Sequence, residues 1–157
     1  MRGKNTLSRQ PVPGRKASAG VRLRAALAAE RPLQVPGVIN AYAAILAEKS
    51  GFKCLYLSGA GVANASYGMP DVGVTTLADV LIDVRRITSI SQLPLLVDAD
   101  TGWGNPRTTV REMIKADAAG IHIEDQVEAK RCGHPAAQVQ RHIRRLVERF
   151  GVVIGDE

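Results

Sequence analysis

The 157-residue sequence has little cysteine and no long apolar run. Cys54 and Cys132 are too few for a disulfide framework, and we expect a reducing compartment, the cytoplasm. No apolar run approaches the ~20 residues that a membrane-spanning helix needs. Residues 1–16 also lack the apolar segment of a secretory signal. We therefore expect a cytoplasmic protein that does not contact a membrane.

Acidic residues are absent before Glu30, so the positive charge gathers at the N-terminus. Lys and Arg outnumber Asp and Glu by 21 to 15 over the whole chain, which gives the net charge of +6. Because the remainder is nearly balanced, this charge gives little support to nucleic-acid binding, and no nucleic-acid partner is predicted. Prolines and glycines in the basic segment 1–16 predict a disordered tail, followed by one domain over 17–157.

The apolar pattern alternates between strands and helices, which predicts an α/β protein with a parallel sheet and helices outside it. Thr76 and Asp79 have the spacing of a helix capping box, and Pro106 suits the first position of a helix whose buried face is Val110, Met113 and Ile114. A long loop is expected over 58–73. Strands are expected over 34–39, 53–57, 94–97, 121–124 and 151–154, and helices over 17–30, 41–50, from 76, from 106 and over 139–150.

An aspartate pair ends the third predicted strand. Asp98 and Asp100 are two positions apart, and alternation along a strand places both side chains on one face, just before the Gly102 turn. Two convergent carboxylates suit a hard cation such as Mg²⁺. The alternative is that the pair only caps and orders the loop.

A cysteine among basic residues follows the fourth predicted strand. Cys132 comes directly after Lys130 and Arg131 and shortly before His134, and such a setting favours the thiolate. The sulfur could therefore serve as an acid or a base near neutral pH. The alternative is that Cys132 is a small buried apolar residue.

Taken together, these motifs resemble the isocitrate lyase and phosphoenolpyruvate mutase superfamily, and within it the methylisocitrate lyase branch. The resemblance covers roughly residues 19–134 and implies the N-terminal portion of a (β/α)8 TIM-type barrel, about four to five βα units. Its strength lies in five short motifs in the right order. They are Tyr56 to Gly61, Pro70 and Asp71 with Gly73, Asp98 to Gly104, Ile123 to Gln126, and Lys130 to His134.

The resemblance implies cleavage of 2-methylisocitrate, a small tricarboxylate, into pyruvate and succinate in the methylcitrate cycle of propionate degradation. The cofactor implied is Mg²⁺, or Mn²⁺ in its place, held by Asp98 and Asp100. Cys132 would protonate the succinate carbanion, and Lys130, Arg131 and His134 would tune its pKa. A homo-oligomer, a tetramer in the family, is also implied.

Other residues receive roles by the same resemblance. Tyr56 is the candidate base for the substrate hydroxyl, although a strand tyrosine is commonly a core or interface residue. Asp71 and Glu124 would orient metal-bound waters, and His122 is expected to form structural hydrogen bonds. The residues implied in substrate binding are Ser58, Gly59, Ala60, Cys132 and Gly133.

The chain departs from this pattern after His134. A closed barrel needs about 250 residues, so we expect a truncated family member whose activity alone is an open question. Two alternatives stay open. One is another superfamily activity, such as that of an isocitrate lyase, a phosphonomutase or hydrolase, or an oxo-acid decarboxylase. The other is a non-catalytic half-barrel remnant.

Overall fold

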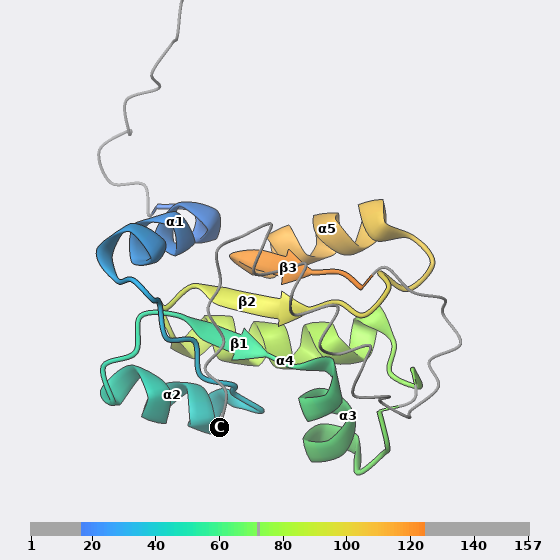
Figure 1. Cartoon of the computed structure of the whole chain (residues 1–157). Coiled ribbons are helices and arrows are strands. Elements are labelled where there is room, and N and C mark those ends of the chain that lie inside the picture. The colour runs from blue at the N-terminus through green and yellow to red at the C-terminus, as the bar shows by residue number, and fades with distance from the viewer. Residues whose placement is uncertain (1–16, 72, 125–157) are drawn as a thin grey trace, which may run out of the picture.

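The computed structural model describes residues 17–71 and 73–124, which form a parallel sheet with helices around it (Figure 1). Within these ranges no helix is long and apolar enough to cross a membrane. The predicted elements over 139–154 and the predicted tail lie outside the described residues. The elements in chain order are α1 (Ala19–Ala29), α2 (Ala41–Lys49), β1 (Leu55–Leu57), α3 (Gly59–Tyr67), α4 (Leu77–Ile90), β2 (Leu95–Asp98), α5 (Pro106–Lys115) and β3 (Gly120–His122).

The strands lie in the order β1, β2, β3, and both pairs are parallel, as the sequence predicts. The first predicted strand, 34–39, is wrong as a strand, because only one bridge forms, between Gly37 and Tyr56. Tyr56 donates its N–H to the Pro36 carbonyl at 3.0 Å and accepts one from Val38 at 2.8 Å. Pro36 has no N–H with which to extend the ladder, which explains why the pairing stays so short.

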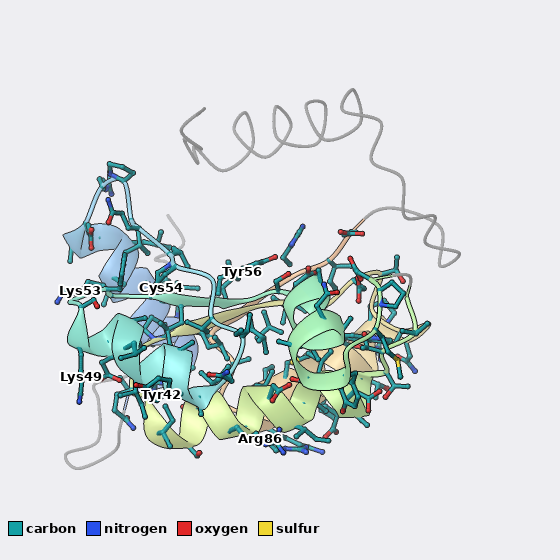
Figure 2. The ribbon with its side chains drawn as sticks, turned by 90° about the horizontal axis from the view of Figure 1, so that it is seen from below. Tyr42, Lys49, Lys53, Cys54, Tyr56 and Arg86 are labelled. Carbon is teal, nitrogen blue, oxygen red and sulfur yellow. The ribbon has the colours of Figure 1, made fainter. Side chains whose placement is uncertain are left out.

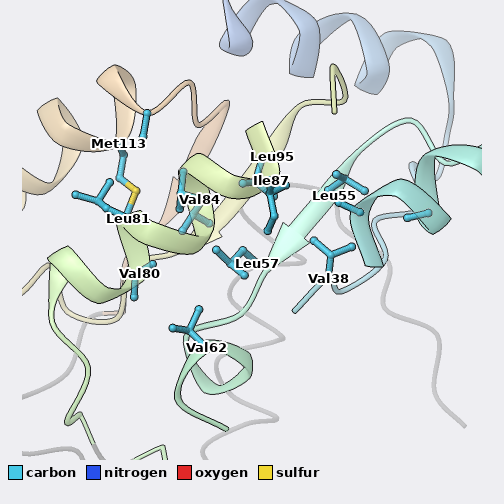
Figure 3. Close-up of a cluster of buried hydrophobic side chains, with 14 residues drawn as sticks. Val38, Leu55, Leu57, Val62, Val80, Leu81, Val84, Ile87, Leu95 and Met113 are labelled. Atoms are coloured by element: carbon cyan, nitrogen blue, oxygen red, sulfur yellow. The ribbon is translucent and has the colours of Figure 1, made fainter. Parts of the chain in front are cut away.

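The core lies between the sheet and α4. The sequence repeats apolar residues at helical spacing here, at Leu77, Val80, Leu81, Val84 and Ile87, and this predicts one apolar stripe. The prediction is confirmed, since Val80, Val84 and Ile87 are at most 1% exposed. They pack in one cluster with Leu57 and Val97 of the strands (Figure 3). Tyr56 alternates with Leu55 and Leu57 and lies on the other side of the sheet, away from the helix that carries Arg86 (Figure 2).

The loop expected over 58–73 is wrong in its first half, where helix α3 forms. The glycines of this segment suggested a loop, but they serve the ends of a helix. Ser58 is the N-cap, and its side chain accepts the N–H of Gly61. Gly68 closes the helix with φ +64°, a left-handed conformation that glycine adopts without strain. Figure 1 shows α3 at the carboxyl end of β1.

The buried face of α5 also differs from the prediction. Met113 is buried as expected, but Val110 and Ile114 are 39% and 68% exposed. Thr109 takes the inward position, because its hydroxyl donates to the Gly102 carbonyl at 2.8 Å. The inward line therefore runs through Thr109 and Met113, four residues apart. A buried threonine with a specific backbone partner is not visible in an apolar pattern.

Candidate metal and active site

The carboxylates of Asp98 and Asp100 converge at the carboxyl end of β2. Both residues are 8% exposed. A methyl group on Gly59 would lie 3.5 Å from Oδ2 of Asp98 and 3.3 Å from Oδ2 of Asp100. The two oxygens therefore face the same point beside the first residue of α3.

Strand alternation alone does not produce this convergence. β2 ends at Asp98, and Asp100 has φ +43°, in the left-handed region. The Asp98 side chain accepts the N–H of Asp100 at 3.1 Å, which ties the two residues together through the reversed backbone. Aspartate tolerates this conformation better than most residues. The predicted neighbourhood is thus present, but a turn creates it.

Two further residues fix the loop that follows. Trp103, with φ +49°, donates its indole N–H to the Thr75 carbonyl at 2.8 Å. The Thr109 hydroxyl donates to the carbonyl of Gly102, the residue before Trp103. The sequence motif contains Trp103 but does not reveal its partner, because Thr75 lies 28 residues earlier. These bonds attach the loop that carries Asp100 to Thr75, just before α4, and to the first turn of α5.

The N-terminus of α3 completes one wall of the site. The Gly59 N–H donates to Oδ2 of Asp98 at 3.3 Å, and the Val62 N–H donates to the Ser58 carbonyl at 3.0 Å. The Gly59 amide expected to bind a substrate carboxylate thus contacts Asp98 instead. The Ala60 amide takes part in neither these bonds nor the Ser58 cap. A helix N-terminus favours negative charge, so α3 supports the carboxylates electrostatically.

Tyr56 lies in the negative field of this cluster. Burial raises the pKa of its phenol above the ordinary value, and the charge of Asp98, hydrogen bonding to Asp98, and the charges of Glu124 and Asp100 raise it further. Tyr56 is therefore a protonated hydrogen-bond donor beside these carboxylates. Glu124 thus lies close enough for its charge to contribute to the raised pKa of Tyr56.

His122, the last residue of β3, and Glu124, two residues later, lie beside the aspartates. Nδ1 of His122 lies 4.0 Å from Oδ1 of Asp98, and the Glu124 N–H donates to the Asp100 carbonyl at 2.7 Å. Because β2 and β3 are paired with Asp98 opposite His122, these contacts follow from the register. Asp71 lies in the segment between α3 and α4 and is half-buried.

The two carboxylates fit a hard divalent cation that takes only some of its ligands from the protein. Two buried carboxylates meet at one point, and oxygen donors are the ligands Mg²⁺ prefers. No group of three or more His, Cys, Asp or Glu side chains poised to hold a metal occurs in 17–71 and 73–124. Such a pair suits Mg²⁺, which keeps several waters or substrate oxygens, better than a metal that needs a full protein cage.

The basic cysteine cluster stays a prediction. Lys130, Arg131, Cys132, Gly133 and His134 lie outside the described residues.

Comparison with known proteins identifies the family. The phosphoenolpyruvate phosphomutase profile matches residues 23–153. The chain belongs to this family. A 2-methylisocitrate lyase of Escherichia coli (strain K12) is 60% identical over 141 residues, 87% of this chain and 48% of the relative. One from Shewanella oneidensis is 54% identical over 140 residues, again 87% and 48%. The chain spans about half the length of these curated relatives.

Solved structures agree on the fold. A 2,3-dimethylmalate lyase of the PEP mutase/isocitrate lyase superfamily matches with a TM-score of 0.66 and 34% identity, over 87% of this chain and 51% of that one. A phosphonopyruvate hydrolase crystallised with oxalate and Mg²⁺ matches with a TM-score of 0.62 and 28% identity, over 88% and 50%. The predicted superfamily and its partial α/β barrel are thereby confirmed.

Proposed function

We propose that this phosphoenolpyruvate phosphomutase family member supplies the metal-binding part of a magnesium-dependent carbon–carbon lyase. The substrate proposed is 2-methylisocitrate, cleaved to pyruvate and succinate in the methylcitrate cycle of the cytoplasm. The convergence of Asp98 and Asp100 beside Gly59 carries the proposal. The names of the curated relatives support the choice of substrate.

Asp98 and Asp100 would hold Mg²⁺, or Mn²⁺ in its place, with waters and substrate oxygens filling the remaining positions. When bound, the cation would polarise the substrate hydroxyl and stabilise negative charge on the nascent pyruvate. Asp71 and Glu124 would orient metal-bound waters. The effect of the Glu124 charge on Tyr56 supports its place near the metal.

Cleavage begins with loss of the substrate hydroxyl proton. The bond to the neighbouring carbon then breaks, pyruvate forms, and the electron pair stays on succinate as a carbanion. Tyr56 is the proposed base, but its raised pKa makes it a poor one while the carboxylates are not neutralised. The positive charge of a cation held beside the carboxylates would lower this pKa, so the cofactor should be present before Tyr56 acts.

The remaining roles fall on α3 and on the basic cluster. Ser58 and the Ala60 amide would bind a substrate carboxylate, since both lie at the N-terminus of a helix. Gly59 contributes by its lack of a side chain. Cys132 would protonate the carbanion, with Lys130, Arg131 and His134 tuning its pKa and Gly133 contacting substrate. We also propose that the chain acts as a homo-oligomer.

Two measurements on the purified 157-residue chain test this function. Mn²⁺ titration followed by electron paramagnetic resonance should show one site, and Asp98→Asn or Asp100→Asn should weaken it at least about tenfold. Glu48→Gln in α2 is the matched control and should leave the affinity unchanged. A folded wild-type chain that binds no Mn²⁺ would contradict the metal site.

The second measurement is pyruvate release from 2-methylisocitrate with Mg²⁺. The wild-type chain should turn over, and Cys132→Ser should not. Metal binding without turnover by the wild-type chain would favour the alternative of a non-catalytic half-barrel remnant. Equal turnover by wild type and Cys132→Ser would remove the sulfur from the mechanism.

A further inference from the structure

Helix α3 is attached to α4 by two adjacent side-chain hydrogen bonds. The Ser66 hydroxyl donates to Oδ2 of Asp83 at 2.6 Å, and the Tyr67 hydroxyl donates to Oδ1 of Asp79 at 3.0 Å. Asp79 and Asp83 are four residues apart on α4 and so lie on one face of that helix. These contacts join the last turn of α3 to the first half of α4.

Asp83 is an unusual residue for this position, because it is 2% exposed. A buried carboxylate is costly unless donors satisfy it. Arg86 contacts the other carboxylate oxygen at 3.2 Å, but its side chain is 64% exposed, so solvent screens this pair. The short bond from Ser66 is therefore the more specific contact, and it comes from the neighbouring helix.

The position of α3 depends on such contacts. The helix has nine residues, and a helix this short is not stable by itself. Its apolar anchors are small, since Val62 and Ala63 are its only buried residues besides Gly59. Figure 3 shows Val62 next to Leu57 and Val80. Small apolar contacts resist sliding weakly, whereas a hydrogen bond fixes a direction and a distance.

The opposite end of the same helix forms the wall of the carboxylate site. Gly59 donates its N–H to Asp98, and its α-carbon faces the side-chain oxygens of both Asp98 and Asp100. A shift of α3 along or away from α4 would therefore change the geometry around both carboxylates. Ser66 and Gly59 move together as long as the helix stays intact.

We propose that Ser66 and Asp83 are positioning residues for the Asp98 and Asp100 site: the bond between them holds α3 against α4 and so sets the place of the Gly59 N–H. They touch neither substrate nor metal and act through the helix. The proposal rests on the proposed function only in that Asp98 and Asp100 are taken as the metal ligands.

The test compares single hydroxyl deletions in the whole chain. Ser66→Ala removes the donor to Asp83, and Ser66→Thr keeps a hydroxyl at this exposed position. Thr88→Val is the matched control, because the Thr88 hydroxyl donates from the other end of α4 to the Ala116 carbonyl at 2.9 Å. Both deletions remove one hydrogen bond from α4 to a neighbour, but only the first reaches α3.

Two readouts separate positioning from general stability. In the metal-free protein, hydrogen exchange of the Gly59 amide should become about tenfold faster in Ser66→Ala, as expected for the loss of one net hydrogen bond. It should stay near the wild-type rate in Ser66→Thr and Thr88→Val. The dissociation constant for Mn²⁺ should rise about threefold to tenfold in Ser66→Ala alone, less than for loss of a direct ligand.

The outcomes are distinguishable from those of the proposed function. If the wild-type chain binds no Mn²⁺, the metal site fails, and Gly59 exchange still decides whether Ser66 positions α3. Unchanged Gly59 exchange in Ser66→Ala would overturn the inference, even if metal binds normally. Equal acceleration in Ser66→Ala and Thr88→Val would also overturn it, because both variants would then act through overall stability.

Discussion

The backbone N–H of Gly59 donates to Oδ2 of Asp98, 39 residues later in the chain, at 3.3 Å. The bond joins the start of α3 to the end of β2, and the absence of a Gly59 side chain allows the approach. It also places one hydrogen-bond donor on the carboxylate proposed to bind metal. The site is therefore sensitive to the size of residue 59.

A Gly59→Ala variant should weaken Mn²⁺ binding about tenfold or more with little loss of stability. The new methyl group would lie 3.5 Å from Oδ2 of Asp98, an ordinary contact, and 3.3 Å from Oδ2 of Asp100, which must shift by a few tenths of an ångström and so change the ligand geometry. Alanine also suits a helix better than glycine does, which offsets part of the cost. Mn²⁺ titration and urea denaturation measure the two effects. Gly37→Ala, where the structure has open space, is the control, and equal metal affinity in both variants would contradict the prediction.

A Trp103→Phe variant should lower the free energy of unfolding by about 1 to 2 kcal/mol. Phenylalanine retains an aromatic ring but cannot donate to the Thr75 carbonyl, and Thr75 is 7% exposed. The loop that carries Asp100 should loosen, so Mn²⁺ affinity should fall as well. Urea denaturation followed by circular dichroism measures the first effect. Unchanged stability would mean that this hydrogen bond does not hold the loop.

A Thr76→Ala variant should lose about 1 kcal/mol of stability through the capping box of α4. The Thr76 side chain accepts the Asp79 N–H, and the Asp79 carboxylate accepts the Thr76 N–H at 2.8 Å. The Thr76 hydroxyl also donates to Oδ2 of Asp79 at 2.7 Å, and this bond, followed by the one from the Thr76 N–H, lowers the pKa of Asp79. Thr76→Ser should retain most of the stability in urea denaturation. An alanine variant as stable as the serine variant would show that the cap contributes nothing.

Cys54 should be unreactive in the folded chain. It is fully buried, and burial raises the pKa of its thiol from 9.0 to about 11. In a Cys132→Ser background, a thiol reagent should react slowly with native protein and rapidly in urea. Rapid reaction with native protein would contradict the buried position.

The raised pKa of the Cys54 thiol also makes the free energy of unfolding depend on pH. The folded state holds the proton more tightly than the unfolded state, so the contribution is fully present below pH 9 and is lost as the pH rises towards about 11. Within this window the free energy of unfolding should fall by about 1.4 kcal/mol per pH unit more than in Cys54→Ala. Parallel pH profiles for the two proteins would contradict it.

Local patterns in the sequence were sufficient for several features. The periodicity of Val80, Val84 and Ile87, the Thr76 cap and the position of Pro106 predicted α4 and the start of α5 correctly. Alternation of strands and helices predicted the parallel sheet, and the motifs predicted the family. These features depend on residues a few positions apart or on short sequence motifs in a fixed order, and both can be read directly from a sequence.

The tertiary structure decided what depends on distant partners. The glycines after Ser58 lie in helix α3 and at its C-cap, not in a loop. Thr109 faces inward because its hydroxyl donates to the Gly102 carbonyl. Asp100 reaches Asp98 through a left-handed turn. The tertiary structure also joined Ser66 to Asp83 and Gly59 to Asp98. The last two of these contacts depend on a hydrogen-bond partner supplied by another element, whereas the Ser58 cap and the Asp98–Asp100 turn are local bonds that the apolar pattern does not display. The sequence by itself determined the chemistry at the end of β2, and the left-handed turn at Asp100 together with the packing of α3 against that end determined its geometry.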